Sequence, residues 1–207
     1  VGYNLSSRLA EDYLFEVEIL KEKHQEALEY KTLAKEILIS NLAKAYNQPT
    51  KNICLTPSGM NAVYCALRGL KTIQNQNGKN KLIQLGWLYL DTMNIVEHYF
   101  EENKIFYDIT DLDLLEDYLK INGHTISAIV TEIPTNPLLQ TVDLARLKNL
   151  CLKYNIVLVI DATFATPFNL DLKPYADIYV ESLTKFACGN ADVLMGAIIL
   201  NENSKIS

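Results

Sequence analysis

The chain has 207 residues, a formal net charge of −6 and a pI near 5.1. This length fits one good-sized α/β domain or part of a two-domain protein. The acidic balance argues against nucleic acid or an anionic membrane as the main partner. The four cysteines form no C-x-x-C pair and the three histidines are isolated, so we expect neither a disulfide framework nor a metal centre. Cys54 and Cys151 lie among apolar residues and are expected in the core.

Targeting signals are not evident in the sequence. Residues 1–4 carry no basic stretch followed by an apolar one, which a signal peptide would need. Nor does any apolar run approach the length that spans a membrane. We therefore expect a cytoplasmic protein.

The N-terminal part of the chain has a helical pattern. Apolar residues in 8–47 recur at helical spacing with charged residues between them, which predicts a long amphipathic helix ending at Asn47 and Pro49. Packing or oligomerisation is the simplest role for such a helix. The pattern changes near residue 50, so we expect an N-terminal helical segment at 1–50 and a large domain at 51–207.

Strands and helices alternate through the large domain. The pattern predicts helices at 62–73, 91–101, 111–120 and 144–154, with a polar surface loop at 74–80. Strands are predicted at 52–56, 81–85, 104–108, 127–133, 156–161, 178–182 and 193–200. Because the strands are apolar and alternate with helices, we predict an α/β fold. Its core is a mostly parallel seven-stranded sheet with helices on both faces.

Polar residues gather where these strands end, and ligands of such sheets bind beyond the carboxyl ends of the strands. Asp161 closes an aliphatic strand, and Lys185 follows another at a place where an amine is costly to desolvate. Ser182 and Thr184 flank Lys185 with hydroxyls. Ser58-Gly59-Met60 joins a strand to a helix, whose first N–H groups attract phosphate. The simpler alternatives are a capping carboxylate at Asp161, a surface lysine at Lys185 and an N-cap at Ser58.

Together these groups have the chemistry of a pyridoxal phosphate site. A lysine can hold the cofactor's aldehyde as a Schiff base. A carboxylate opposite the pyridine nitrogen keeps that nitrogen protonated, which makes the ring a better electron sink. Hydroxyls and a helix start can bind the phosphate. Neither G-x-G-x-x-G nor G-x-x-x-x-G-K-[ST] occurs, which disfavours a nucleotide site.

Four motifs, in chain order, resemble those of the pyridoxal-phosphate enzymes of cysteine and methionine metabolism, the cystathionine γ-synthase and γ-lyase group. They cover about residues 50–200. The motifs are Ser58-Gly59-Met60-Asn61-Ala62, Glu132-Ile133-Pro134-Thr135-Asn136-Pro137, Asp161-Ala162-Thr163-Phe164-Ala165-Thr166-Pro167, and the run from Ala176 through Ser182-Leu183-Thr184-Lys185 to Gly196. The resemblance implies the fold-type-I large domain for residues 51–207.

The resemblance also implies roles for single residues. Lys185 would hold the cofactor and shuttle protons, and Tyr89 would stack on the cofactor ring; these two are the implied catalytic residues. Asp161 would face the pyridine nitrogen, and Asn136 would donate to the ring's phenolic oxygen. The cofactor-binding set implied in this way is Ser58, Gly59, Met60, Tyr89, Asn136, Asp161, Thr163, Ser182, Thr184 and Lys185.

The implied activity is elimination or replacement at the β or γ carbon of a sulfur amino acid or its precursor. The enzyme would be a carbon–sulfur lyase or a transferase working as a homodimer or homotetramer. Departures from the family pattern are Leu90-Asp91 and Ala162, together with Gly189-Asn190-Ala191-Asp192. The family's C-terminal substrate domain would begin just after Leu200, so we expect this chain to lack it. Two alternatives stay open: another fold-type-I enzyme, such as an aminotransferase or decarboxylase, and an inactive fragment that serves as an assembly module.

Overall fold

A computed structural model describes residues 7–23, 31–100, 102–190 and 192–206. Residues 1–4, considered above for a signal peptide, lie outside this part, as do residues 24–30 of the predicted N-terminal helix. Short 3₁₀ helices lie at Lys31–Leu33, Thr50–Asn52 and Gly123–Thr125. In chain order the other elements are α1 (Ser7–Glu16), α2 (Ala34–Ala45), β1 (Ile53–Thr56), α3 (Gly59–Asn75), β2 (Lys81–Leu85), α4 (Leu90–Tyr99), β3 (Asn103–Phe106), α5 (Leu112–Asn122), β4 (Ile126–Glu132), α6 (Leu144–Tyr154), β5 (Val157–Asp161), α7 (Thr166–Asn169), β6 (Ile178–Ser182) and β7 (Gly196–Leu200).

The strands form one seven-stranded sheet in the order β1-β7-β6-β5-β4-β2-β3, which confirms the predicted mostly parallel architecture. Strands β3, β2, β4, β5 and β6 are parallel, whereas β7 is antiparallel to both of its neighbours. Because β7 runs opposite to both, β1 and β6 point the same way. The carboxyl ends of β1 and β6, at Thr56 and Ser182, therefore lie on the same side of the sheet, and each of these residues pairs with Gly196.

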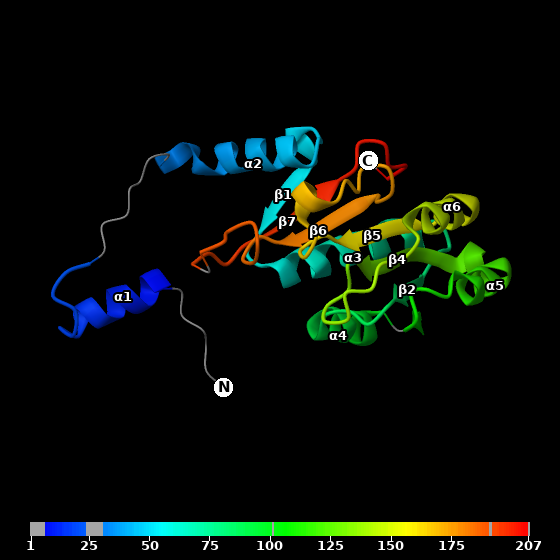
Figure 1. Cartoon of the computed structure of the whole chain (residues 1–207), viewed down its shortest axis with the longest axis horizontal. Coiled ribbons are helices and arrows are strands. Elements are labelled where there is room, and N and C mark those ends of the chain that lie inside the picture. Colours follow the sequence, from blue (N-terminus) through cyan, green and yellow to red (C-terminus); the bar gives the residue numbers. More distant parts are fainter. Residues whose placement is uncertain (1–6, 24–30, 101, 191, 207) are drawn as a thin grey trace.

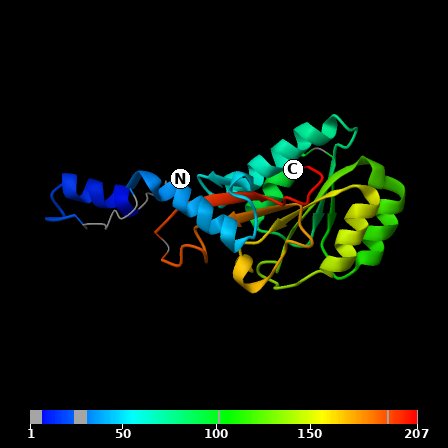
Figure 2. The same cartoon turned by 90° about the horizontal axis from the view of Figure 1, so that it is seen from above.

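Helices cover both faces of the sheet (Figures 1 and 2). On one face, α3 and α4 enclose a core that includes Leu67 and Val96. On the other face, α2, α5 and α6 enclose a second core that includes Leu42, Leu115 and Leu147. Burial of this apolar surface is the main force that holds the layers together.

Strand periodicity decides which side chains enter which face. Successive residues of a strand point to opposite faces. Val157 and Val159 of β5 belong to the core under α3, so Asp161 at the end of β5 lies on the same side. Glu132 follows Val130 in β4 by the same rule and pairs in register with Asp161.

The single helix predicted over residues 8–47 is wrong. Helix α1 ends at Glu16, and Glu18 takes the left-handed conformation (φ 59°). The N–H of Ile19 then bonds to the carbonyl of Leu14, and the N–H of Glu18 to that of Phe15. These two bonds are a Schellman motif, which closes a helix whatever the apolar spacing beyond it. The predicted stop at Asn47 (φ 49°) is confirmed, since α2 ends just before it.

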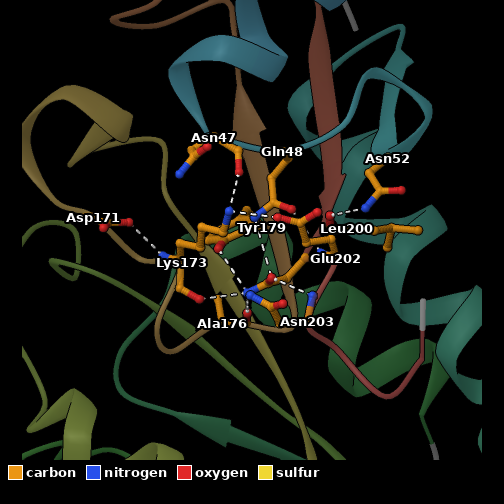
Figure 3. Close-up of polar contacts among 11 residues, drawn as sticks. Asn47, Gln48, Asn52, Asp171, Lys173, Ala176, Tyr179, Leu200, Glu202 and Asn203 are labelled. Atoms are coloured by element: carbon orange, nitrogen blue, oxygen red, sulfur yellow. Dashed lines mark hydrogen bonds and ion pairs between the residues drawn. The ribbon is translucent and has the colours of Figure 1, made fainter.

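A polar network joins the end of α2 to the end of β7 (Figure 3). Lys173 Nζ donates to the carbonyl of Asn47 at 2.7 Å and pairs with Glu202 at 2.8 Å. The side chain of Asn201 donates to the carbonyls of Lys173 and Ala176 at 2.8 and 2.7 Å. These bonds fix the N-terminal α2 against the C-terminal end of the described chain.

The burial predicted from local sequence is wrong at single residues whose surroundings depend on the tertiary fold. Cys54 is exposed rather than buried, because β1 is an edge strand of the sheet, whereas Cys151 is buried as expected. All four cysteines fall in the described residues and are free. In the predicted surface loop at 74–80, residues 75–78 and 80 are exposed as predicted, but Gln74 and Lys79 are buried. Lys79 Nζ donates to the carbonyls of Tyr154 and Asn155 at the end of α6, so a lysine predicted to be solvated supports a helix end.

Candidate active site

A cavity of about 810 Å³ opens at the carboxyl edge of the sheet. The loops that follow β1, β2, β4, β5 and β6 all contribute to its wall. Every residue proposed from the sequence for cofactor binding or catalysis lies on this wall: Ser58, Gly59, Met60, Tyr89, Asn136, Asp161, Thr163, Ser182, Thr184 and Lys185. The structure thus brings the ten together in one cavity, while their individual roles remain predictions.

The start of α3 forms one end of the cavity. Ser58 is the N-cap, and its Oγ accepts the N–H of Asn61 at 3.1 Å, so the simple N-cap interpretation is also correct. Gly59 lies tight against β6, since a Cβ built on it would be 2.5 Å from the Cβ of Ser182. Gly59 and Met60, the first two residues of the helix, line the cavity there, and N–H groups at a helix start have no acceptor within the helix.

Thr163 links the two strands that carry the central polar residues. Its Oγ1 accepts the N–H of Ser182 at 2.8 Å, and its own N–H donates to Asp161 Oδ1 at 2.9 Å. Thr184 is held differently, because its hydroxyl both donates to the carbonyl and accepts from the N–H of Met195. Thr184 therefore ties the loop after β6 to the chain before β7 as well as lining the cavity.

Asp161 is a partly buried carboxylate without a cation. Burial raises its pKa above the ordinary value, while the hydrogen bonds from Thr163 oppose that rise. Within the described part of the chain no lysine, arginine or histidine pairs with it. A carboxylate in this setting has most to gain from a cationic ligand.

Lys185 lies in the turn after β6, and its side chain is exposed on the cavity wall. The amine therefore does not incur the cost of desolvation that burial at the end of a strand would bring. The strand ends at Ser182, and the N–H of Lys185 bonds to the carbonyl of Ser182, which turns the chain toward the cavity. The amine is accessible to a ligand in the cavity.

Glu132 also belongs to the site, although the sequence, where it begins one of the four motifs, predicted no role for it. It closes β4, is only 5% exposed, and lines the same cavity. Burial, with a contribution from Asp161, raises its pKa to about 7 despite hydrogen bonds from the N–H groups of Tyr89 and Asn136. The signal that could have found it is the one that singled out Asp161, a carboxylate at the end of a buried strand.

Aromatic and aliphatic side chains form another part of the wall that went unpredicted. Phe164 and Phe186 meet edge to face with ring centroids 5.5 Å apart, and Leu194 lies on the same wall. Each of the three is more than 40% exposed. Their place in the cavity comes from loops that periodicity does not describe.

The arrangement fits pyridoxal phosphate on evidence from this chain alone. A carboxylate without a cation suits a protonated pyridine, a helix start with nearby hydroxyls suits a phosphate, and an accessible lysine suits an aldehyde. Among the described residues no group of three or more metal-ligating side chains occurs, nor any helix long and apolar enough to cross a membrane. Fold and site together define the class of pyridoxal-phosphate-dependent enzymes.

Comparison with known proteins identifies the family within that class. The family described as "Cys/Met metabolism PLP-dependent enzyme" matches residues 8–207, and the chain belongs to it. The chain is 36% identical over 206 residues to an L-2-amino-4-chloropent-4-enoate dechlorinase/desaturase of Streptantibioticus cattleyicolor, covering 98% of this chain and 41% of the relative. It is also 36% identical over 179 residues to a cystathionine gamma-synthase of Neurospora crassa, covering 84% and 29%.

A solved structure agrees with this assignment. The crystal structure of an O-acetylhomoserine (thiol)-lyase described as putative, from Campylobacter jejuni, superimposes with a TM-score of 0.71 at 26% identity. The match covers 98% of this chain and 47% of that one, and that protein carries a pyridoxyl-lysine phosphate. The chain therefore spans less than half the length of these relatives.

Proposed function

We propose that this chain is the cofactor-binding part of a pyridoxal-phosphate enzyme that eliminates or replaces a group at the side chain of a sulfur amino acid or its homoserine-type precursor. The observation that carries the proposal is the carboxylate of Asp161, which has no cation among the described residues and shares a cavity with the accessible amine of Lys185. An accessible amine in the turn after β6 and an unpaired carboxylate at the end of the neighbouring β5 suit a ligand with an aldehyde and a cationic ring.

Each end of the cavity has its own task in this proposal. Lys185 Nζ holds the cofactor and moves a proton at the substrate's α carbon, while Asp161 keeps the ring nitrogen protonated. The phosphate is surrounded by the start of α3 and the hydroxyls near β6, namely Ser58, Gly59, Met60, Ser182 and Thr184. The N–H of Thr163 orients the carboxylate of Asp161. Tyr89 and Asn136 contact the ring from the β2 and β4 loops. When bound, the cofactor supplies an electrophilic carbonyl carbon and an electron sink.

Reaction at the γ carbon is the version that the relatives favour. The Streptantibioticus protein is named for an amino acid with chlorine on carbon 4, which is the γ carbon of a 2-amino acid. The Neurospora protein is named a gamma-synthase. The Phe164, Phe186 and Leu194 wall offers an apolar surface for a substrate side chain that extends past its α carbon.

The cofactor assignment is tested by absorption and trapping. The purified chain should turn yellow with pyridoxal phosphate, and borohydride should fix the cofactor on the peptide that contains Lys185. Lys185→Ala should abolish this adduct. Covalent trapping that persists in the Lys185→Ala variant would refute the assignment of Lys185 as the lysine that binds the cofactor.

The reaction type is tested with the whole protein. Incubation with cystathionine should release ammonia and an oxo acid if the enzyme is a lyase, and O-acylated homoserine with a thiol should give the thioether if it is a γ-replacement enzyme. Transfer of the amino group to an added oxo acid, with neither of those products, would instead identify an aminotransferase.

We also propose a homo-oligomer in the cytoplasm, with an N-terminal helical segment at residues 1–50 and the cofactor domain from residue 51. Exposed aromatic residues at the cavity wall, such as Phe186 at 60%, support self-association. Light scattering of the cofactor-loaded whole protein should give at least a dimer. A strictly monomeric loaded species contradicts this part of the proposal.

A further inference from the structure

The carboxylate of Glu132 joins two loops of the cavity wall that are far apart in the sequence. Its Oε1 accepts the N–H of Tyr89 at 2.6 Å, and its Oε2 accepts the N–H of Asn136 at 3.3 Å. Tyr89 is the N-cap residue of α4, in the loop after β2, and its own side chain makes no capping bond. The carboxylate thus fixes the backbone at each residue from the buried end of β4.

Both bonds depend on the charge of Glu132. An ionised carboxylate is an acceptor on both oxygens, whereas a protonated one must carry a donor on one of them. Hydrogen bonds to a charged acceptor are also stronger than neutral ones. Proton uptake would therefore loosen at least one of the two loops, although nothing else in the fold need change.

We propose that Glu132 is a positioning residue, which in its ionised form sets the backbone of Tyr89 and Asn136 so that their side chains meet the cofactor ring. This inference rests on the proposed function, because it assumes that the ring lies between those two side chains. Glu132 acts through the two loops and has no chemical step of its own.

Surrounding charges make this positioning sensitive to pH. Asp161, in register on β5, faces Glu132 and disfavours its ionisation, and the pKa of Glu132 rises to about 7. The other titratable groups on the cavity wall are Tyr89 and Lys185. A cationic ring beside Asp161 would offset the negative charge of that carboxylate and favour the ionised Glu132, so cofactor and loops would order each other.

The first test needs neither the cofactor nor a variant. Hydrogen exchange of the cofactor-free chain is followed at the amides of Tyr89 and Asn136 between pH 5.5 and 8.5. After correction for intrinsic exchange, protection should rise about ten-fold as pH passes through the pKa of Glu132. Protection that stays flat across this range overturns the inference, whether or not the chain binds pyridoxal phosphate.

The second test uses the loaded chain and a matched control. Glu132→Gln should weaken pyridoxal phosphate binding about ten-fold, because one N–H loses its acceptor, and should change the visible circular dichroism of the bound cofactor. Glu181→Gln is the control. It neutralises another buried glutamate, the residue before the end of β6, which is 2% exposed, has a pKa of about 7 and contacts Tyr46 on the opposite face of the sheet. It should leave affinity and dichroism unchanged.

The outcomes separate the two proposals. Wild-type affinity and dichroism in Glu132→Gln, in a chain that binds cofactor normally, overturn the positioning role and leave the proposed function intact. Equal losses in Glu132→Gln and Glu181→Gln also overturn it, since they would show a general effect of buried charge. Failure of the wild-type chain to bind cofactor overturns the proposed function and the positioning role together.

Discussion

Gly59 at the start of α3 and Ser182 at the end of β6 touch so closely that a Cβ on Gly59 would lie 2.5 Å from the Cβ of Ser182 and 2.9 Å from its Cα. Real Cβ atoms do not come so near, so Gly59→Ala must push the helix start away from the strand. Overpacking of this kind costs about 1–3 kcal/mol. We expect Gly59→Ala to lower stability by that amount in urea unfolding and to weaken pyridoxal phosphate binding more strongly, because the phosphate end of the cavity is displaced.

Gly69 in the same helix is the matched control. A Cβ there meets nothing within 4 Å, and alanine is the better helix former. Gly69→Ala should therefore raise stability by about 0.5–1 kcal/mol and leave cofactor binding alone. Equal responses at the two glycines would contradict the close contact at Gly59.

Tyr46 of the helical N-terminal segment donates a hydrogen bond to Glu181 of β6, 135 positions away. Burial raises the pKa of Glu181 to about 7, and the bond from Tyr46 lowers it in part. Tyr46→Phe removes this donor and leaves a buried carboxylate. We expect a loss of about 1.5–3 kcal/mol above pH 7, where Glu181 is ionised, measured by thermal or urea unfolding.

The raised pKa of Glu181 fixes the direction in which folding stability changes with pH. A glutamate whose pKa is higher in the folded than in the unfolded state binds more protons when folded, so stability falls as pH rises from about 4.5 to 7. Glu181→Gln should flatten this part of the curve, and Tyr46→Phe should steepen it. A Tyr46→Phe penalty that is the same at pH 5 and pH 8 would show that only packing was lost.

Lys79 offers a test of a buried amine that acts on a helix end. Its Nζ donates to the carbonyls of Tyr154 and Asn155, where α6 ends, and burial lowers its pKa. Lys79→Met keeps most of the apolar stem but leaves those carbonyls without a donor, so we expect a loss of about 1–3 kcal/mol. Lys71 bonds to the carbonyl of Tyr99 at a more exposed place, and Lys71→Met should cost much less. Similar losses in urea unfolding would refute the role of burial.

Much of the large domain could be predicted because its strands are short apolar runs with sharp ends. Strand β2 has the predicted bounds, 81–85, and β6 the predicted bounds 178–182. The direction of β7 could not be predicted, since an apolar run has the same sequence pattern whether its strand pairs parallel or antiparallel. The break at Glu18 was missed because the left-handed helix end there uses a residue other than the usual glycine or asparagine.

Part of the cavity could be predicted for a similar reason. The carboxyl ends of parallel strands lie on one side of a sheet, so Asp161 after β5 and Ser182 after β6 were expected near each other. Gly59 reaches them because β7 pairs antiparallel with both β1 and β6, an arrangement that the sequence pattern does not show. Contacts that depend on loops were not accessible in this way. The bond that the N–H of Tyr89 donates to Glu132 spans 43 positions and leaves no local pattern in either segment.

Asp161→Asn should separate stability from function. The wild-type carboxylate is desolvated, has a raised pKa and lacks a cation among the described residues, so its charge is a cost to the cofactor-free fold. Asparagine keeps an oxygen that can accept the N–H of Thr163 and removes the charge. We therefore expect the cofactor-free variant to be more stable than wild type by about 1 kcal/mol or more at pH 7. The advantage should shrink as pH falls toward 4, because protonation neutralises the wild-type carboxyl as well.

The Asp161→Asn variant should also bind pyridoxal phosphate at least about ten-fold more weakly, since the charge opposite the ring nitrogen is gone. Unfolding of the free chain and titration with cofactor measure the two effects separately. A variant that loses stability and keeps its affinity would mean that Asp161 is a structural capping residue rather than the partner of the ring.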